Sequence, residues 1–340
     1  MRVCITGGAG FIGSHLAKYL KQCGHYVVVA DWKDNEFMSV EDFCDEFHKL
    51  DLRSLANCIK VTKDCDEVYH LAADMGGMGF IQSNNGAILF NNTVMSLHVI
   101  ESCRINCVKR LFYSSSACVY PEYKQTSSDI GTGLKEEDAW PAQPQDAYGL
   151  EKLVTEEMCK HYMKDFGMQI RVARFHNVYG PYGTWFGGRE KAPAAICRKV
   201  AVADHEVEIW GDGEQTRSFM YIDDCVEGIL RIMHSDIKEP INLGSSELVS
   251  INTLAKYAMD IANKPNVQIK YVPGPIGVMG RNSDNSNIIS KLNWEPRYPL
   301  KEGLKHTYKW IVGEIEKQTE NKERFKNSMV CQISAPNCVE

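Results

Sequence analysis

The sequence predicts an α/β fold in which a parallel β-sheet is flanked by helices and followed by a smaller second domain. Short apolar runs alternate with helical patterns through the first half of the chain, which is typical of repeated βαβ units. A glycine-rich segment, TGGAGFIG at residues 6–13, stands where the first strand would pass into the first helix. Beyond Asn177, loops rich in glycine and proline separate shorter elements, which indicates a change of domain.

The first half contains six short apolar runs that predict strands. They occupy residues 3–6, 26–31, 46–51, 67–71, 110–115 and 169–175. Helical patterns fit between them, for example at 11–22 and 91–104. Strands joined by helices in this order predict parallel pairing.

The second half predicts a strand at 207–210 that ends in a turn at 211–213, and a strand at 241–243. Helices are expected at 251–262 and 301–317, the second of them amphipathic. We expect a sheet domain over 1–176, rejoined by about 217–243. Residues 177–216 and 244–318 would form the second domain, with a cleft between the two. Residues 319–340 are expected to be a loosely ordered tail.

The composition is that of an ordinary globular protein, with 340 residues, 44% hydrophobic and 24% charged. A net charge of -6 without a basic run argues against nucleic acid as a partner. The 13 cysteines are irregularly spaced and lack metal-ligand grouping, which favours reduced thiols and no metal site. The first strand leaves no targeting segment, and no apolar run is long enough to span a membrane. We therefore expect a cytoplasmic protein without a membrane partner.

The TGGAGFIG segment has the GxxGxxG spacing of a dinucleotide-binding loop. Glycines allow a tight turn and a close approach of the backbone to a pyrophosphate, which the following helix N-terminus favours electrostatically. An ordinary turn is the alternative interpretation. The residues expected to bind the cofactor here are Gly7, Gly10, Phe11, Ile12 and Gly13.

Asp31 ends the second predicted strand, about 20 residues after the glycines, where an acid binds the adenosine ribose. Its carboxylate would accept hydrogen bonds from the ribose hydroxyls and repel a 2′-phosphate, so NAD is predicted rather than NADP. A simple turn cap is the alternative. Asp51 follows the third strand and is expected near the adenine.

The segment YGLEK, residues 148–152, places Tyr148 and Lys152 one helical turn apart on a shared face. A free phenol has a pKa of about 10. We expect the neighbouring cation to lower the pKa of Tyr148 toward neutrality and make it a usable base. This spacing often marks only a helix face, but the glycine loop and the upstream hydroxyl of Ser116 strengthen the catalytic interpretation.

With these motifs, the chain resembles the extended short-chain dehydrogenase/reductase family over roughly residues 1–317. The resemblance implies a Rossmann-type, doubly wound parallel sheet with a smaller C-terminal domain that binds a sugar nucleotide. It also implies that Ser116 hydrogen-bonds the reacting sugar hydroxyl and that Tyr148 takes its proton. Lys152 would tune the tyrosine and hold the nicotinamide ribose. Such proteins are commonly homodimers through paired helices.

Within that family, the residues beside the serine select the reaction. The 4,6-dehydratases carry Thr-Asp-Glu at this position, whereas SSSACVYP, residues 114–121, offers Ser116, Ala117 and Cys118. The acids needed for elimination are therefore missing. A cysteine before Val-Tyr-Pro resembles the epimerase-reductases that form GDP-fucose. The alternative for Cys118 is a small core side chain.

Inversion beside a ketone needs an acid and a base on opposite faces of the sugar ring. A thiol with a pKa of about 8.5 suits one face. Lys191, in GGREKAP at 187–193, is a candidate for the other. A lysine normally titrates at about 10.4, so it needs desolvation or a cationic neighbour such as Arg189. Spacing alone favours a solvated charge for Lys191.

Four longer segments narrow the resemblance to the GDP-mannose 3,5-epimerases of that family: DMGGMGF (74–80), WPAQPQDAY (140–148), GGREKAP (187–193) and GRNSD (280–284). This implies epimerisation of GDP-mannose at C3 and C5, to GDP-L-galactose with GDP-L-gulose, through transient C4 oxidation by bound NAD. Cys118 and Lys191 would be the acid/base pair. The implied substrate-binding residues are Gly76, Ser116, Ala117, Cys118, Asn177, Glu190, Lys191, Ala192, Lys199, Gln215, Thr216, Arg217 and Arg281.

Two alternatives remain. Another epimerase-reductase of this family, of the type acting on GDP-4-keto-6-deoxymannose with NADPH, would need a basic residue in place of Asp31. A non-catalytic NAD-binding protein would be expected to lack Ser116, Tyr148 or Lys152, and all three are present.

Overall fold

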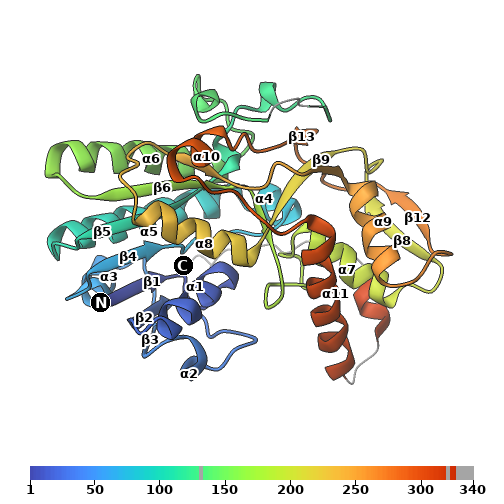
Figure 1. Cartoon of the computed structure of the whole chain (residues 1–340), viewed down its shortest axis with the longest axis horizontal. Helices are drawn as coiled ribbons and strands as arrows, with labels where there is room; N and C mark the ends of the chain where they lie inside the picture. Colours follow the sequence, from blue (N-terminus) through green and yellow to red (C-terminus); the bar gives the residue numbers. More distant parts are fainter. Residues whose placement is uncertain (130–132, 319–321, 327–340) are drawn as a thin grey trace, which may run out of the picture.

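A seven-stranded parallel sheet forms the centre of the computed structural model, which describes residues 1–129, 133–318 and 322–326 (Figure 1). The strand order is β10-β6-β5-β4-β1-β2-β3. The strands are β1 (Arg2–Thr6), β2 (Tyr26–Asp31), β3 (Glu46–Lys49), β4 (Glu67–His70), β5 (Arg110–Ser116), β6 (Ile170–Phe175) and β10 (Ile241–Leu243). All six neighbouring pairs are parallel, which confirms the predicted fold class.

Helices cover both faces of this sheet. α3 (Leu55–Thr62), α5 (Asn85–Ile105) and α6 (Ala147–Phe166) form one layer, and α1 (Phe11–Gln22) and α8 (Ile222–Met233) form the other. Along β1, Val3 and Ile5 join the core under α1, whereas Cys4 joins the core under α3 and α5. This alternation is the two-sided burial that a doubly wound parallel sheet requires.

The predicted elements agree with the structure except at some boundaries. β3 ends at Lys49 rather than at residue 51, and β5 runs on to Ser116. α5 begins at Asn85, six residues before its predicted start, and directly follows the short α4 (Met78–Ser83). Its first turns leave Leu89 and Phe90 exposed, so they lack the apolar periodicity by which a buried helix face is recognised.

Smaller sheets lie beside the carboxyl ends of the central strands. β9 (Thr216–Tyr221) pairs with β7 (Asn177–Tyr179), β11 (Leu248–Ser250) and β13 (Gly280–Arg281). β8 (Glu206–Trp210) pairs with β12 (Gln268–Val272). The helices α7 (Ala192–Val202), α9 (Ile251–Ile261) and α11 (Leu300–Lys317) pack together against these strands. The predicted turn after β8 is present, with positive φ at Gly211 and Gly213.

The chain returns from this smaller unit to the central sheet through α8 and β10. α8 packs on β5 and β6, and β10 pairs with β6 at the sheet edge. β9 belongs to the smaller sheet, and α8 follows it directly along the chain. The domain boundaries themselves stay a prediction.

Part of the expected tail has a defined position. Lys322–Lys326 form a 3-10 turn, and Phe325 is buried against Trp185 and Phe186, with ring centroids 5.2 and 5.0 Å away. The rest of 319–340 lies outside the described residues. Within the described part of the chain, no helix has the length and apolar character needed to span a membrane.

Candidate active site

One cleft of about 1100 Å³ opens at the carboxyl ends of the central strands. Ligands of open α/β sheets bind at this edge. The cleft runs from the glycine loop at Gly7, past Tyr148, to Arg281 beside the smaller sheet. All of the predicted site residues line it except Lys152, which lies behind Tyr148, and Thr216. Thr216 turns its hydroxyl away to donate to Ser128 O at 2.6 Å.

Two glycines of the segment between β1 and the first turn of α1, Gly7 and Gly13, leave no room for a side chain. Gly7 has φ +72°, and a Cβ there would lie 2.6 Å from Ala72 N. A Cβ on Gly13 would lie 2.2 Å from Gly7 O. The backbone at the start of α1 therefore faces the cleft directly, which is the surface that a pyrophosphate needs.

Asp31 is 5% exposed at the end of β2 and lines the same part of the cleft. Its carboxylate accepts hydrogen bonds from Ala9 N at 3.0 Å and Trp32 N at 2.8 Å. Burial raises the pKa of this carboxyl, and the backbone donors oppose that shift. Asp51 lines the cleft nearby and pairs with Arg53 at 2.7 Å. The glycine loop and Asp31 together fit a dinucleotide whose ribose hydroxyls are unphosphorylated.

Tyr148 stands in the first turn of α6, where Asp146 caps the helix by accepting from Gly149 N at 2.8 Å. Gly149 is one position to which the sequence analysis gave no role. A Cβ there would lie 2.1 Å from Cys118 O, so only glycine lets α6 start against the turn after β5. The sequence signal that could have indicated this role is the place of Gly149 directly after Tyr148 in YGLEK.

Lys152 lies one turn after Tyr148, and its Nζ is 5.6 Å from the Tyr148 ring centroid. The side chain is 1% exposed, and Glu151 Oε1 lies 3.7 Å from Nζ. Among the described residues, Lys152 Nζ and Glu151 Oε2 have no hydrogen-bond partner. A buried ammonium without an acceptor fits the hydroxyls of a nicotinamide ribose.

The pKa of Tyr148 differs from the sequence-based expectation. Burial raises it well above the usual value for a phenol, the charges of Cys118 and Glu151 act in the same direction, and a hydrogen bond with Ser116 opposes the shift. The prediction considered the Lys152 cation but not the desolvation of the phenol or the carboxylate of Glu151.

Cys118 follows β5 in a short 3-10 turn, where its backbone N donates to Ser116 Oγ at 3.1 Å. The side chain is half-buried and lines the cleft. Arg281 Nη1 donates to Cys118 Sγ at 3.2 Å and Arg281 Nε donates to Gln125 Oε1 at 2.6 Å. Burial, aided by Arg281, lowers the pKa of Arg217 to about 9. Two neighbouring guanidiniums favour an anion at this end of the cleft.

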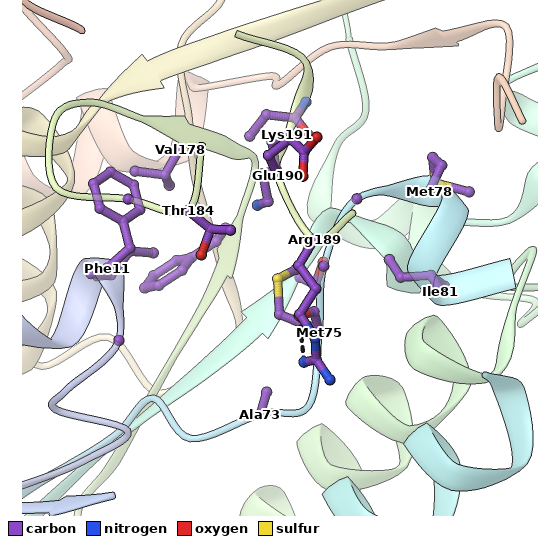
Figure 2. A pocket seen from close by; sticks show the side chains of 18 of the residues that line it. Phe11, Ala73, Met75, Met78, Ile81, Val178, Thr184, Arg189, Glu190 and Lys191 are labelled. Atoms are coloured by element: carbon purple, nitrogen blue, oxygen red, sulfur yellow. Dashed lines mark hydrogen bonds between the residues drawn. The ribbon is translucent and has the colours of Figure 1, made fainter. Parts of the chain in front are cut away.

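Lys191 is the N-cap residue of α7 and lines the cleft beside these groups. Burial lowers its pKa, and the electrostatic influence of the nearby Cys118 opposes that shift. Figure 2 shows Arg189 reaching to Met75, with Glu190 and Lys191 following on the same segment.

The hydrogen bonds of the Glu190 carboxylate go to neighbouring protein groups that stabilise the loop. It accepts from Gly188 N at 2.6 Å and from Arg198 Nη2 at 3.0 Å. Lys199 also lines the cleft, and burial lowers its pKa to about 8. Its Nζ donates to Glu208 O at 2.8 Å.

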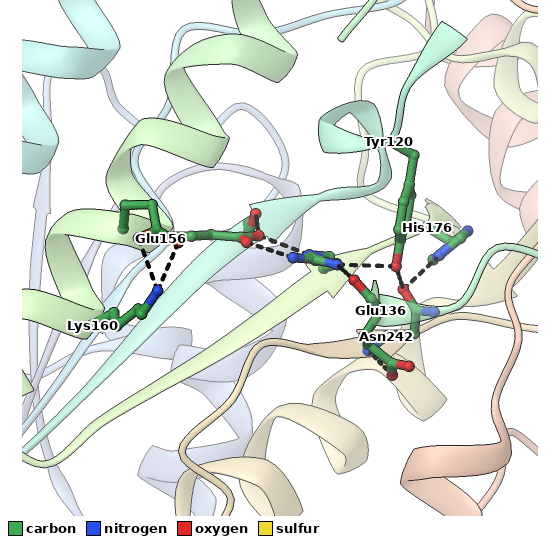
Figure 3. A network of polar contacts seen from close by, with 9 residues as sticks. Tyr120, Glu136, Glu156, Lys160, His176 and Asn242 are labelled. Atoms are coloured by element: carbon green, nitrogen blue, oxygen red, sulfur yellow. Dashed lines mark hydrogen bonds and ion pairs between the residues drawn. The ribbon is translucent and has the colours of Figure 1, made fainter. Parts of the chain in front are cut away.

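A buried polar network, which the sequence did not reveal, supports the strand that carries Ser116 (Figure 3). Arg174 on β6 forms a bidentate pair with Glu156 on α6, at 2.9 and 2.7 Å, and Ser115 donates to the same carboxylate. Tyr120 OH donates to Asn242 Oδ1 at 2.6 Å. The network ties the strand end and the following turn to β6, β10 and α6. Within the described ranges, no His, Cys, Asp or Glu group is arranged to hold a metal ion.

Comparisons with known proteins agree with this geometry. Residues 3–244 match the NAD dependent epimerase/dehydratase family. The chain is 58% identical over 318 residues to "GDP-mannose 3,5-epimerase 1" of Oryza sativa subsp. indica, covering 94% of this chain and 83% of that protein. It is also 58% identical over 318 residues to the GDP-mannose 3,5-epimerase of Arabidopsis thaliana, covering 94% and 84%. A Bacillus cereus UDP-glucuronic acid 4-epimerase, solved with UDP-glucuronic acid and NAD, is similar in structure. Its TM-score is 0.78 with 27% identity, covering 92% of this chain and 100% of that one.

Proposed function

The chain belongs to the NAD dependent epimerase/dehydratase family, and we propose that it is an NAD-dependent isomerase that epimerises GDP-mannose at C3 and C5. The observation that carries this conclusion is the 58% identity, over 94% of the chain, to GDP-mannose 3,5-epimerases. Incubation of the purified protein with GDP-mannose tests it, with the products separated by ion-exchange chromatography and identified by NMR. Unchanged GDP-mannose would contradict it.

The first task of the site is to oxidise C4. Bound NAD supplies the hydride acceptor for this step and the hydride donor for its reversal. Tyr148 takes the proton of the C4 hydroxyl, and Ser116 holds that hydroxyl by a hydrogen bond. The raised pKa of Tyr148 means that the buried phenol is protonated without ligand, so a bound cation beside it is needed to favour the phenolate. Lys152, whose ammonium lacks an acceptor, contributes to that charge.

The second task is to invert the neighbouring carbons. A C4 ketone makes the C3 and C5 protons acidic, because each conjugate base is an enolate. One of Cys118 and Lys191 removes a proton from one ring face and the other returns a proton to the opposite face. Both side chains line the same cleft beside Tyr148. The lowered pKa of Lys191 favours a neutral amine that can act as a base. Hydride return to C4 then completes a reaction without net redox change.

Cationic side chains support a sugar nucleotide as the ligand. Arg217, Arg281 and Lys199 line the end of the cleft beyond Cys118. Guanidinium and ammonium groups suit a pyrophosphate, whose oxygens they can bind by charge-assisted hydrogen bonds. At the opposite end, Asp31 favours NAD over NADP, which weakens the alternative of an NADPH-consuming reductase.

We further propose a homodimer that pairs α5 and α6 of two copies. Exposed apolar side chains on these helices support it, because a lone chain rarely presents so many on one pair of helices. They are Leu89, Phe90 and Leu97 on α5, and Leu150 and Val154 on α6. A cytoplasmic location is also proposed, since the described cysteines are free thiols, which persist in reducing compartments.

A further inference from the structure

A continuous set of contacts joins the loop that carries Lys191 to α6, the helix that carries the redox pair Tyr148 and Lys152. Its centre is Asp74, in the segment between β4 and α4, and its other end is Arg189. Sequence reasoning weighed Arg189 only as a cation near Lys191 and gave Asp74 no role. The contacts of Asp74 and Arg189 instead indicate a structural role in holding the loop that carries Lys191.

Asp74 is fixed by α5 through three hydrogen bonds. Its backbone N donates to Asn92 Oδ1 at 2.6 Å, and its backbone O accepts from Asn92 Nδ2 at 3.2 Å. Asn91 Nδ2 donates to its carboxylate Oδ2 at 3.2 Å. Asn92 Nδ2 also donates to Glu151 Oε1 at 3.1 Å, beside Lys152. Asp74 is thereby held in place relative to the redox pair.

The remaining carboxylate oxygen of Asp74 holds Arg189. Arg189 Nη1 lies 2.9 Å from Asp74 Oδ1, and its guanidinium stacks 3.8 Å from the centroid of the Phe80 ring. Arg189 also donates to Met75 O at 3.4 Å, as Figure 2 shows. An arginine held by a carboxylate, an aromatic face and a carbonyl has little freedom to move.

The backbone of the Lys191 loop docks at the same place. Gly77 N donates to Arg189 O at 3.1 Å, and a Cβ on Gly77 would lie 2.5 Å from Glu190 O. The residue that follows Glu190 is Lys191. The position of its Cα is therefore set from the Asp74 side of the cleft by side-chain and backbone contacts together.

We propose that Asp74 and Arg189 are positioning residues that place the Lys191 amine for proton exchange at the sugar ring. The inference rests on the proposed function, because it takes Lys191 as an acid/base group. It predicts separable steps. C4 oxidation depends on Tyr148 and Lys152 and is retained when the ion pair is broken, whereas proton exchange at C3 and C5 slows because Lys191 loses its position.

The variants Asp74→Asn and Arg189→Leu test this. The hydrogen bonds of Asn92 with Asp74 go only to the main chain of Asp74, so Asp74→Asn retains them. After single mixing with GDP-mannose, NADH absorbance reports C4 oxidation, and NMR in deuterated water reports exchange at C3 and C5. We expect unchanged NADH formation with exchange slowed by roughly 10- to 100-fold, the scale of a displaced catalytic group. Arg189→Lys should restore part of the loss, and the double variant should be no slower than the worse single variant, since the two residues act as one unit.

Arg231→Ala is the matched control. It removes an ion pair in which Arg231 Nη2 lies 2.7 Å from Glu227 Oε1, and neither residue lines the cleft. This variant should change neither step. Equal loss of both steps in the Asp74 and Arg189 variants, or no loss of exchange, would overturn the inference. Lys191→Ala separates it from the proposed function. If Lys191→Ala exchanges normally, the acid/base assignment fails. If Lys191→Ala stops exchange while Asp74→Asn and Arg189→Leu do not slow it, only the inference fails.

Discussion

Arg281 Nη1 donates a hydrogen bond to Cys118 Sγ across 3.2 Å, and both side chains line the cleft. The donor helps to fix the direction of the sulfur, and Cys118 lines the ligand space while it also packs against the buried cluster that contains Phe80 and Tyr148. If Cys118 were only a small core side chain, a hydrogen bond from a cationic arginine would not be expected at its sulfur. The contact also places the thiol beside a cation suited to the anionic part of a sugar nucleotide. We therefore propose that Arg281 orients both Cys118 and that part of the substrate.

Tyr148→Phe removes the proton acceptor of C4 oxidation while keeping the ring packing. We expect turnover to fall by about 100-fold or more, the scale for loss of a positioned acid/base group, with GDP-mannose binding retained. Steady-state kinetics and calorimetric titration measure the two effects. Tyr162→Phe is the control, because this phenol lies on the same helix and binds Glu101 at 3.0 Å, away from the cleft. Near-normal turnover of Tyr148→Phe would exclude C4 oxidation through this residue.

The purified protein should carry NAD(H) and not NADP(H), because the Asp31 carboxylate would repel a 2′-phosphate. Acid release and chromatography of the bound nucleotide measure this. Asp31→Ser should retain less NAD and discriminate less against NADP. Asp34→Ser, which changes an exposed acid paired with Lys49, should behave like the unaltered protein. Stoichiometric NADP in the unaltered protein is the contradicting result.

Two buried histidines predict that stability falls on acidification. Burial lowers the pKa of His70 and of His176 from 6.5 to about 3. The unfolded chain therefore binds more protons than the folded chain between these values, and stability is lost as pH falls below 6.5. At pH 5 each histidine should cost about 2 kcal/mol of unfolding free energy relative to neutral pH.

Urea unfolding at pH 7 and pH 5 measures that difference. His176→Asn should reduce it by about 2 kcal/mol, whatever its effect at neutral pH. His161→Asn, an exposed position on α6, should leave the difference unchanged. An identical pH dependence in His176→Asn and the unaltered protein would argue against the buried neutral imidazole.

Charge on the exposed face of α5 should separate the proposed dimer. Phe90 is 62% exposed, and Phe90→Asp would place a carboxylate in the apolar contact between two copies. Light scattering after size exclusion should show half the mass of the unaltered protein. Tyr271→Asp, at a 52% exposed position on β12, should leave the mass unchanged. A monomeric unaltered protein would contradict the proposal.

The sequence predicted the fold well because its strands are short, apolar and separated by helical patterns. Parallel sheets bury both strand faces, so the runs at β1, β2, β5 and β6 could be located within a residue or so. Most of the predicted site residues line the cleft, because the glycine spacing, YGLEK and the SSSACVYP turn each lie at the carboxyl end of a strand or the start of a helix.

What the sequence did not predict depends on contacts between distant segments. The raised pKa of Tyr148 follows from burial, which local spacing does not report. Glu190 has a charge suited to a ligand, yet Arg198 and a loop amide occupy it. Asp74 and Arg189 are 115 residues apart, and their pairing needs the folded chain.

Deuterium incorporation during reaction with GDP-mannose in deuterated water tests the central claim most directly. The account predicts label at C3 and C5 and none at C4, because the C4 hydrogen travels as hydride and never meets solvent. Cys118→Ala and Lys191→Ala should fold, bind GDP-mannose and oxidise C4, yet form no epimer, since each inversion needs both an acid and a base. Any label that these variants incorporate should enter with retention of configuration, because the remaining group serves only one ring face. Epimer without label at C3 and C5, or wild-type rates of epimer formation in Cys118→Ala, would contradict the account.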